Sequence, residues 1–275
     1  MSFLLIAMAI CMAWYFYLND NGIGLFVCLL IITHLAVHVM LQSKLLDTLI
    51  TLFYLLLLLL IPAMMSVQDA KQQMLRGAMI RKVAIAFHQY HNDYHQLPAL
   101  SIRSKNGLPL LSWRVTLLPF LGYDELYRQF RLDEPWSSDH NIKLLSQAPD
   151  CYLPVHHRNL VGHTHLVALT GSGSIYSEPK MTLREASLGD GLGETAMLGE
   201  SARLIPWTKP DDEDFSPDLV PPSLMAYPES SCACKIVMLD GKVRNLYKSR
   251  VNNYAQLRKL ITWRGNDPVD PDFLD

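Results

Sequence analysis

The hydrophobic and polar positions divide the chain into an apolar head and a mixed body. Three long apolar runs, Ser2–Leu18, Ile23–Leu41 and Leu45–Met65, are separated only by short polar turns. Each run is about as long as the roughly 20 residues that a helix needs to cross a bilayer, and no basic region or cleavage site marks the first as a removed signal. The pattern predicts a three-helix transmembrane region at 1–66 and a soluble domain at 67–275.

The third run continues as a helical pattern beyond the predicted membrane region. From Leu45 to about Tyr94 only Pro62 and Gly77 interrupt it. The apolar positions of its later half recur at helical spacing, namely Ile80, Val83, Ala84, Phe87, His91 and Tyr94. One helix of roughly 50 residues would be about 75 Å long, and its later half is expected to pack on a folded body.

Beyond residue 150 the pattern changes to short β segments. They are expected at His163–Thr170, Thr195–Leu198, Lys235–Leu239 and Lys242–Tyr247. The last two flank Asp240-Gly241, which predicts a two-residue hairpin turn with both residues at positive φ. The expected fold class is α+β, with the last N-terminal transmembrane helix continuing as a long helix packed on a small, mainly antiparallel sheet.

Smaller elements follow from capping residues and proline. Ser112 is expected to cap a short helix that begins at Trp113, and a closing helix is expected from Asn253 to about Trp263. The segment Pro206–Pro228 is rich in proline and acidic residues, so a surface loop is expected there.

Charge is concentrated in the body. Residues 1–65 contain a single lysine and no arginine, whereas residues 67–275 hold 23 of the 24 Lys+Arg and 24 of the 26 Asp+Glu. This nearly neutral balance has no basic stripe, so nucleic acid is not an expected partner. The basic residues soon after the third run favour a cytoplasmic body by the positive-inside rule.

The five cysteines lie in two settings. Cys11 and Cys28 fall within apolar runs, and Cys151, Cys232 and Cys234 fall in the body. Three thiols cannot all pair with one another, and Cys151 is left with Cys232 or Cys234 as alternative partners if the body lies in an oxidising compartment. The Cys-x-Cys pair has too few neighbouring ligands for a zinc site.

The sharpest candidate for a metal site is a histidine group at the end of the long helix. His88, His91 and His95 are spaced at i, i+3 and i+7 and share one helical face. With Asp93 or a distant histidine they would suit zinc or another transition metal. The alternative is that they are packing residues with a favourable charge near the helix C-terminus.

Two further polar groups in the body favour structural interpretations. Asp211–Asp214 and the nearby Asp218 offer enough oxygen for calcium but lack the ligand spacing of a calcium loop, so a solvated surface loop is expected. His163 and His165 alternate on one face of a strand, close to His156-His157, and packing or exposure is the expected role.

Within the second apolar run, His34 and His38 share one helical face, with Asp47 near the start of the third run. Such groups suggest proton transfer, but hydrogen bonds between helices are the favoured interpretation. The chain contains no nucleophile elbow, no His-Glu-x-x-His and no phosphate loop. An enzyme is therefore not expected, nor are catalytic residues or a cofactor.

The order of several motifs resembles a known family. The motif segments are Ala86–Tyr94 with Leu97-Pro98, Ser112–Val115, Leu117–Leu121, Leu126-Tyr127, Leu132–Trp136, Asp190–Glu200, Pro206–Asp211 and Leu239–Arg244. Together they resemble the prepilin-like family of unknown function that is abundant in planctomycete bacteria and related to type IV pilins and pseudopilins. The resemblance covers about residues 56–269 and implies a pilin-like helix on an antiparallel sheet.

The chain departs from the usual family pattern in two places. Members of the family carry a glycine followed five residues later by glutamate before one membrane helix, whereas Gly24 is followed by no such acid and no glycine precedes Asp47 at the required place. The chain is thus similar to a variant with extra N-terminal transmembrane helices and no prepilin cleavage motif. Ser230 also stands where many members have histidine.

The resemblance implies a membrane-anchored, non-enzymatic cell-envelope protein whose pseudopilin-like domain serves assembly or protein interaction. Membrane lipid and other pilin-like or secretion-system proteins are the expected partners. The implied location is the cytoplasmic membrane, multi-pass, with the body outside the cytoplasm, and this outweighs the count of basic residues. The alternative is a membrane-tethered ligand- or metal-binding sensory module.

Overall fold

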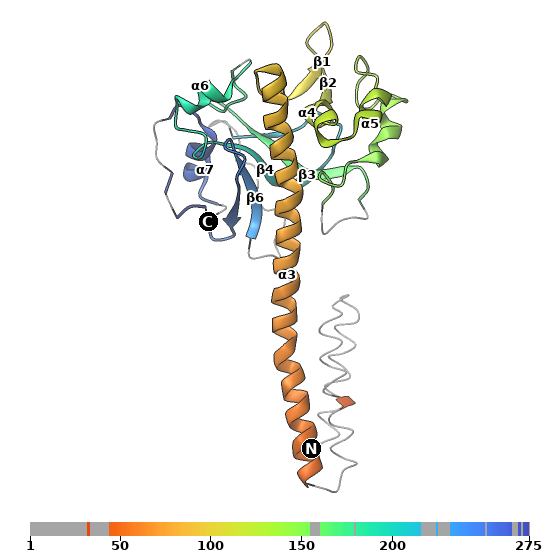
Figure 1. Cartoon of the computed structure of the whole chain (residues 1–275), viewed down its shortest axis with the longest axis vertical. Helices are drawn as coiled ribbons and strands as arrows, with labels where there is room; N and C mark the ends of the chain where they lie inside the picture. The colour runs from red at the N-terminus through yellow and green to blue at the C-terminus, as the bar shows by residue number, and fades with distance from the viewer. Residues whose placement is uncertain are drawn as a thin grey trace. The chain divides into compact units, whose positions relative to one another are not determined.

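Figure 1 shows a computed structural model of the chain. The structure describes residues 32–33, 44–154, 160–178, 180–215, 224, 232–250, 252–265, 269–270 and 272–274. The chain divides into two compact units, Met1–Lys71 and Gln72–Asp275. Apart from residues 32–33, the predicted runs Ser2–Leu18 and Ile23–Leu41, including His34 and His38, lie outside the described residues.

The prediction of N-terminal transmembrane helices is wrong for the part of the chain that the structure describes. A helix needs about 20 consecutive apolar residues to cross a bilayer. No helix among the described residues is both long enough and apolar enough to do so. The fold is α+β, with one sheet of five strands and one of two strands.

The long helix α3 (Lys44–Tyr94) has almost the predicted bounds. In its later part, Ile80, Val83, Ala84 and Phe87 are buried, as the sequence predicts, because these spacings place the side chains on one helical face. The stripe does not extend to the end of the helix, since Tyr94 is 58 % exposed.

The five-stranded sheet has the order β5-β3-β4-β6-β7. Its strands are β3 (His163–Thr170), β4 (Ala196–Pro206), β5 (Glu213–Asp214), β6 (Cys232–Met238) and β7 (Val243–Tyr247). All neighbours pair antiparallel except β3 and β5, which are parallel. The bounds of β3 are those predicted, whereas β4 is longer than the predicted segment.

The remaining elements are short. A two-stranded antiparallel sheet joins β1 (Ser101–Arg103) to β2 (Pro109–Ser112). The helices are α4 (Trp113–Thr116), η1 (Pro119–Leu121), α5 (Asp124–Gln129), η2 (Asn141–Gln147), α6 (Leu183–Ser187) and α7 (Tyr254–Ile261). The predicted closing helix is confirmed as α7, and Asn253 accepts a capping hydrogen bond from the N–H of Gln256.

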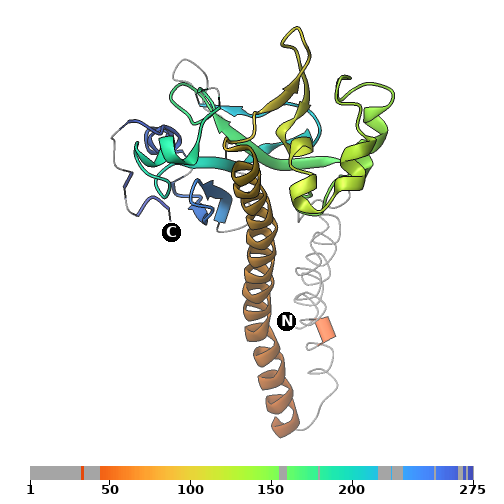
Figure 2. The same cartoon turned by 45° about the horizontal axis from the view of Figure 1, so that its top comes forward.

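The five-stranded sheet is covered on both faces (Figure 2). On one face the stripe of α3 packs with Trp113 and with strand residues such as Leu166 and Val237. On the other face Ile236 packs with α7 and the C-terminal Phe273. Because adjacent strand residues point to opposite faces, Ile236 and Val237 belong to the two different cores.

The hairpin between β6 and β7 differs from the predicted two-residue turn. Met238 donates its N–H to the Lys242 carbonyl at 2.9 Å, and Gly241 donates to the Met238 carbonyl at 3.0 Å. Gly241 has a φ of 83°, and Asp240 has none of the positive φ that a two-residue turn requires. The connection is therefore a three-residue loop that ends on a left-handed glycine.

Candidate functional site

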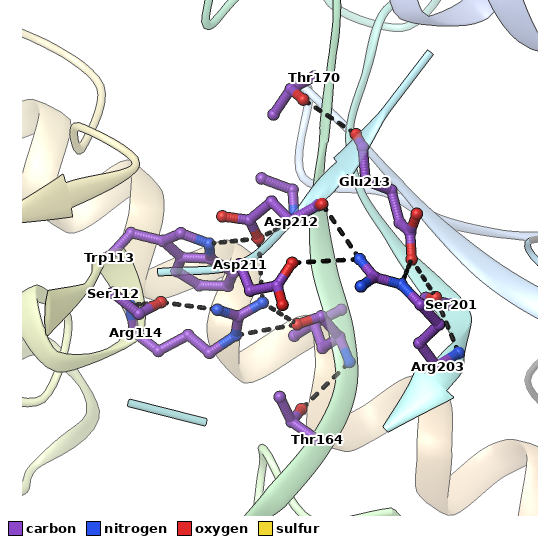
Figure 3. Close-up of polar contacts among 12 residues, drawn as sticks. Ser112, Trp113, Arg114, Thr164, Thr170, Ser201, Arg203, Asp211, Asp212 and Glu213 are labelled. Carbon is purple, nitrogen blue, oxygen red and sulfur yellow. Dashed lines mark hydrogen bonds and ion pairs between the residues drawn. The ribbon is translucent and has the colours of Figure 1, made fainter. Parts of the chain in front are cut away.

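A buried polar network joins the Ser112-Trp113-Arg114 motif to the sheet (Figure 3). Ser112 caps α4 by accepting from the backbone N–H of Arg114 at 3.3 Å, as the sequence predicts. Its hydroxyl also accepts from Nη1 of Arg114 at 2.6 Å. The Arg114 side chain is 0 % exposed, so the cap and the charge are enclosed together.

The Arg114 guanidinium reaches the backbone of β3. Its Nε and Nη2 donate to the Leu166 carbonyl at 2.9 and 2.6 Å. The register between β3 and β4 shifts between Thr164 and Leu166, and such a bulge interrupts the ladder of strand hydrogen bonds. The irregularity thus leaves a carbonyl for a side chain to satisfy.

Asp212 completes this network from the segment that follows β4. Its Oδ1 accepts from Nη2 of Arg114 at 3.0 Å, from Nε1 of Trp113 at 3.1 Å and from the Ala168 N–H at 2.8 Å. Burial raises the pKa of Asp212, against the opposing effects of Arg114 and the other donors. One carboxylate oxygen therefore connects the α4 motif, β3 and the acidic loop.

The expectation of a solvated acidic loop is wrong for Asp212 and Glu213. Glu213 is buried and accepts from Oγ of Ser201 at 2.5 Å and from Nε of Arg203 at 2.7 Å. Asp211 forms ion pairs with Arg203 at 3.2 Å and with Lys209 at 2.8 Å. Carboxylates that would bind calcium are thus engaged by the chain itself, while Asp218 lies outside the described residues.

A second buried ion pair links α3 to the sheet. Nη2 of Arg76 lies 2.5 Å from Oε2 of Glu200 on β4, and both side chains are almost fully buried. The same oxygen accepts from the Lys235 N–H at 2.7 Å. The sequence pattern does not predict this pair, although Arg76 stands four residues before Ile80, in line with the buried stripe.

The three predicted metal ligands lie in different surroundings. Nε2 of His91 accepts from the Leu183 N–H at 3.2 Å, and burial lowers its pKa, as do His88 and His95. Burial also lowers the pKa of His88, against a smaller opposing effect of Asp240. His95 is exposed and follows the helix at a left-handed φ of 55°.

These contacts favour packing and capping roles for the histidines. Among the described residues no group of three His, Cys, Asp or Glu side chains is placed to hold a metal ion. The His91 nitrogen that accepts a backbone hydrogen bond would have to give it up to bind a metal. The metal hypothesis stays a prediction, which calorimetric titration of the full chain with zinc tests directly.

The strand histidines and the cysteines also have structural surroundings. His165 is buried, and its Nδ1 lies 2.9 Å from the Ser201 carbonyl. Cys151 and Cys234 are buried in different cores, so the Cys151–Cys234 disulfide is not formed. Burial raises the pKa of Cys151 to about 12, which keeps the thiol protonated and unreactive. The side chain of Cys232 and the pair 156–157 lie outside the described residues.

The polar contacts of the body have one chemical feature in common. In the described residues, five buried or nearly buried charges each meet a partner of the same chain, namely Arg114, Asp212, Arg76, Glu200 and Glu213. Buried charges that are paired in this way hold segments together, and breaking one pair is costly. The residues of the Ser-Trp-Arg motif are therefore scaffold residues.

A comparison with known proteins gives a match in the part of the chain that carries this motif. Residues 79–155 match a family model described as "Protein of unknown function (DUF1559)". The matched stretch contains the end of α3, the β1–β2 sheet and the Ser112–Arg114 motif. Neither curated proteins nor solved structures give a match. In this stretch the chain is similar to a family of unknown function.

Proposed function

We propose that this chain is a non-enzymatic, pseudopilin-like cell-envelope protein that acts by assembly or by interaction with other proteins. The proposal includes the relation of the matched family to prepilins. It also includes a location at the cytoplasmic membrane with the body on the outer side. The layout of a long helix on an antiparallel sheet supports it, as do the motifs that build a scaffold.

One observation carries the proposal. The later part of α3 buries the stripe around Val83 and Phe87 but exposes apolar side chains on its other side, with Met74 77 % and Ile85 51 % exposed. These two residues are 11 positions apart, about three helical turns, and therefore share a face. Exposed apolar residues that line up on one surface are typical of protein interaction sites.

Site-specific photo-crosslinking in native cells tests the proposal. A crosslinking residue at Ile85 of the full chain is expected to capture pilin-like proteins, secretion-system proteins or second copies of the chain. Arg128, exposed on α5, is the matched control and should give only background. Equal capture from both positions would contradict the proposal.

The location is tested separately. Alkaline phosphatase fused after Asp275 should be active, because the enzyme folds only outside the cytoplasm. Fractionation should recover the fusion with the membranes. An inactive fusion, or one found in the cytosol, would contradict the proposed side of the membrane.

A further inference from the structure

A cavity of about 490 Å³ lies between two segments of the body that are distant in sequence. One wall is formed by residues 96–101 and 103, which lead from α3 into β1. The other is formed by residues 175–178 and 180–181, which follow β3. The Leu97 N–H donates to the Met181 carbonyl at 2.8 Å, which ties the two walls together. The volume lies within the range of pockets that hold small ligands.

The cavity has an apolar part. Leu97, Leu100, Ile175 and Met181 all contribute to its lining. Leu97, Ile175 and Met181 belong to the buried core, which holds these walls in place. An apolar group of a ligand would find a preformed surface here.

The polar part of the cavity carries an excess of positive charge. Ser101 and Arg103 are alternate residues of β1 and both line the cavity, whereas Ile102 between them packs on the core. Lys180 and Glu178 line the opposite wall. Two cations and one acid leave one net positive charge, and none of the three forms an ion pair with another described residue.

The backbone constrains both cationic residues, Arg103 through a hydrogen bond and Lys180 through its own conformation. Nη1 of Arg103 donates to the Gly107 carbonyl at 2.9 Å, which orients the guanidinium. Lys180 has a left-handed φ of 60°, a conformation that side-chain-bearing residues other than Asn and Asp seldom adopt. Such conformations persist where the surrounding structure imposes them, and they concentrate at ligand-binding segments.

We propose that this cavity binds a small carboxylate with an apolar body. The apolar body would contact Leu100 and the accessible edges of Leu97 and Met181, and the carboxylate would be held by Arg103 and Lys180 through charge-assisted hydrogen bonds. The same chemistry is offered by a free aliphatic acid and by the C-terminus of a peptide that ends in an apolar residue. The site goes beyond the proposed interaction function and does not depend on it.

Isothermal titration of the purified full chain tests the site with three probes. Octanoate represents the free acid, N-acetyl-Ala-Ala-Leu with a free carboxylate represents a peptide C-terminus, and octylamine carries the opposite charge. One of the two carboxylates is expected to bind saturably at one site, and the stronger of them identifies the source. Octylamine is expected not to bind.

Four variants locate the binding. Arg103→Gln and Lys180→Asn should each weaken it about tenfold, and asparagine tolerates the left-handed backbone of position 180. Lys105→Gln, in the neighbouring turn, is the matched control and should bind as the parent chain does. Ala99→Trp at the exposed edge of the cavity should abolish binding, with circular dichroism showing that the variant folds.

Three results would overturn the proposal. They are no saturable uptake of either carboxylate, equal or stronger binding of octylamine, and carboxylate binding that Arg103→Gln and Lys180→Asn leave unchanged. The test with Arg103→Gln and Lys180→Asn remains decisive even if Ala99→Trp does not fold. Both cations are exposed, so their replacement should leave the fold intact.

Discussion

The guanidinium of Arg114 donates to Oδ1 of Asp212 at 3.0 Å and joins positions 98 residues apart. The same oxygen accepts from the Trp113 indole and from the Ala168 backbone. Because the arginine also satisfies the Leu166 carbonyl, one ion pair links a helical motif, a strand and a loop. Loss of this ion pair should lower the stability of the whole body.

Asp212→Ala should lower the free energy of unfolding by about 3–5 kcal/mol, because it leaves the buried Arg114 charge without its carboxylate. Urea denaturation of the full chain measures the effect. Asp211→Ala is the matched control, since its ion pairs lie nearer the surface and are worth about 1 kcal/mol or less. Similar losses for the two variants would contradict the structural role assigned to Asp212.

Glu200→Met should also cost about 3–5 kcal/mol, because Arg76 then remains buried without this carboxylate. The double variant Arg76→Met/Glu200→Met should recover much of this loss, because apolar side chains of similar size remove both charges. A double-mutant cycle in urea measures the coupling. Additive single effects would show that the two side chains do not interact.

The body should lose stability as the pH falls below about 6.5. Burial lowers the pKa of His91 and of His88 from an ordinary value of 6.5. Below pH 6.5 these two imidazoles therefore bind protons more readily in the unfolded chain than in the folded chain. The stabilisation is complete above pH 6.5 and decreases as the pH falls through the lowered values. Urea melts at pH 7.5 and 5.5 measure the difference.

Two substitutions test whether His91 causes this pH dependence. His91→Gln should reduce the difference between the two pH values, because the acceptor of the Leu183 N–H no longer titrates. His95→Asn is the comparison and should reduce the difference less, since His95 is exposed and its charge is the smallest of the three causes that lower the pKa of His91, while asparagine tolerates the left-handed backbone of position 95. An unchanged pH dependence in His91→Gln would remove His91 from the explanation.

The same chemical change should have opposite effects at two glycines. Gly77→Ala should stabilise by about 0.5–1 kcal/mol, since alanine favours a helix and an added Cβ meets nothing within 4 Å. Gly189→Ala should destabilise by about 1–3 kcal/mol or more, because its Cβ would lie 1.9 Å from the Trp263 carbonyl oxygen. Thermal melts distinguish the two, and a shift of the same sign in both would contradict this packing.

Local patterns predicted the regular elements well. The spacing of Ile80, Val83 and Phe87 predicts the buried face of α3, and the short β segment expected at His163–Thr170 has the bounds of β3. Ser112 was identified as a cap from its type and place. Such features depend on residues a few positions apart, so a sequence pattern contains them.

The hairpin turn and the acidic loop show where local patterns fail. Asp240-Gly241 predicted a two-residue turn, but the pairing of Met238 with Lys242 sets a three-residue loop. The acidity of Asp211–Asp214 predicted solvation, but Arg114 and Arg203 lie opposite these carboxylates. In both cases a distant partner or strand register outweighs composition.

The sequence by itself determined the α+β class of the body, the helix α3 and most of the strands, because hydrophobic periodicity and capping act over a few residues. Only the tertiary structure decided that Asp212 lies almost buried beside Arg114 and that Arg76 meets Glu200, 124 residues away. It also brought Arg103 and Lys180 to one cavity. Such pairings depend on how the chain returns to itself, which short-range patterns do not encode.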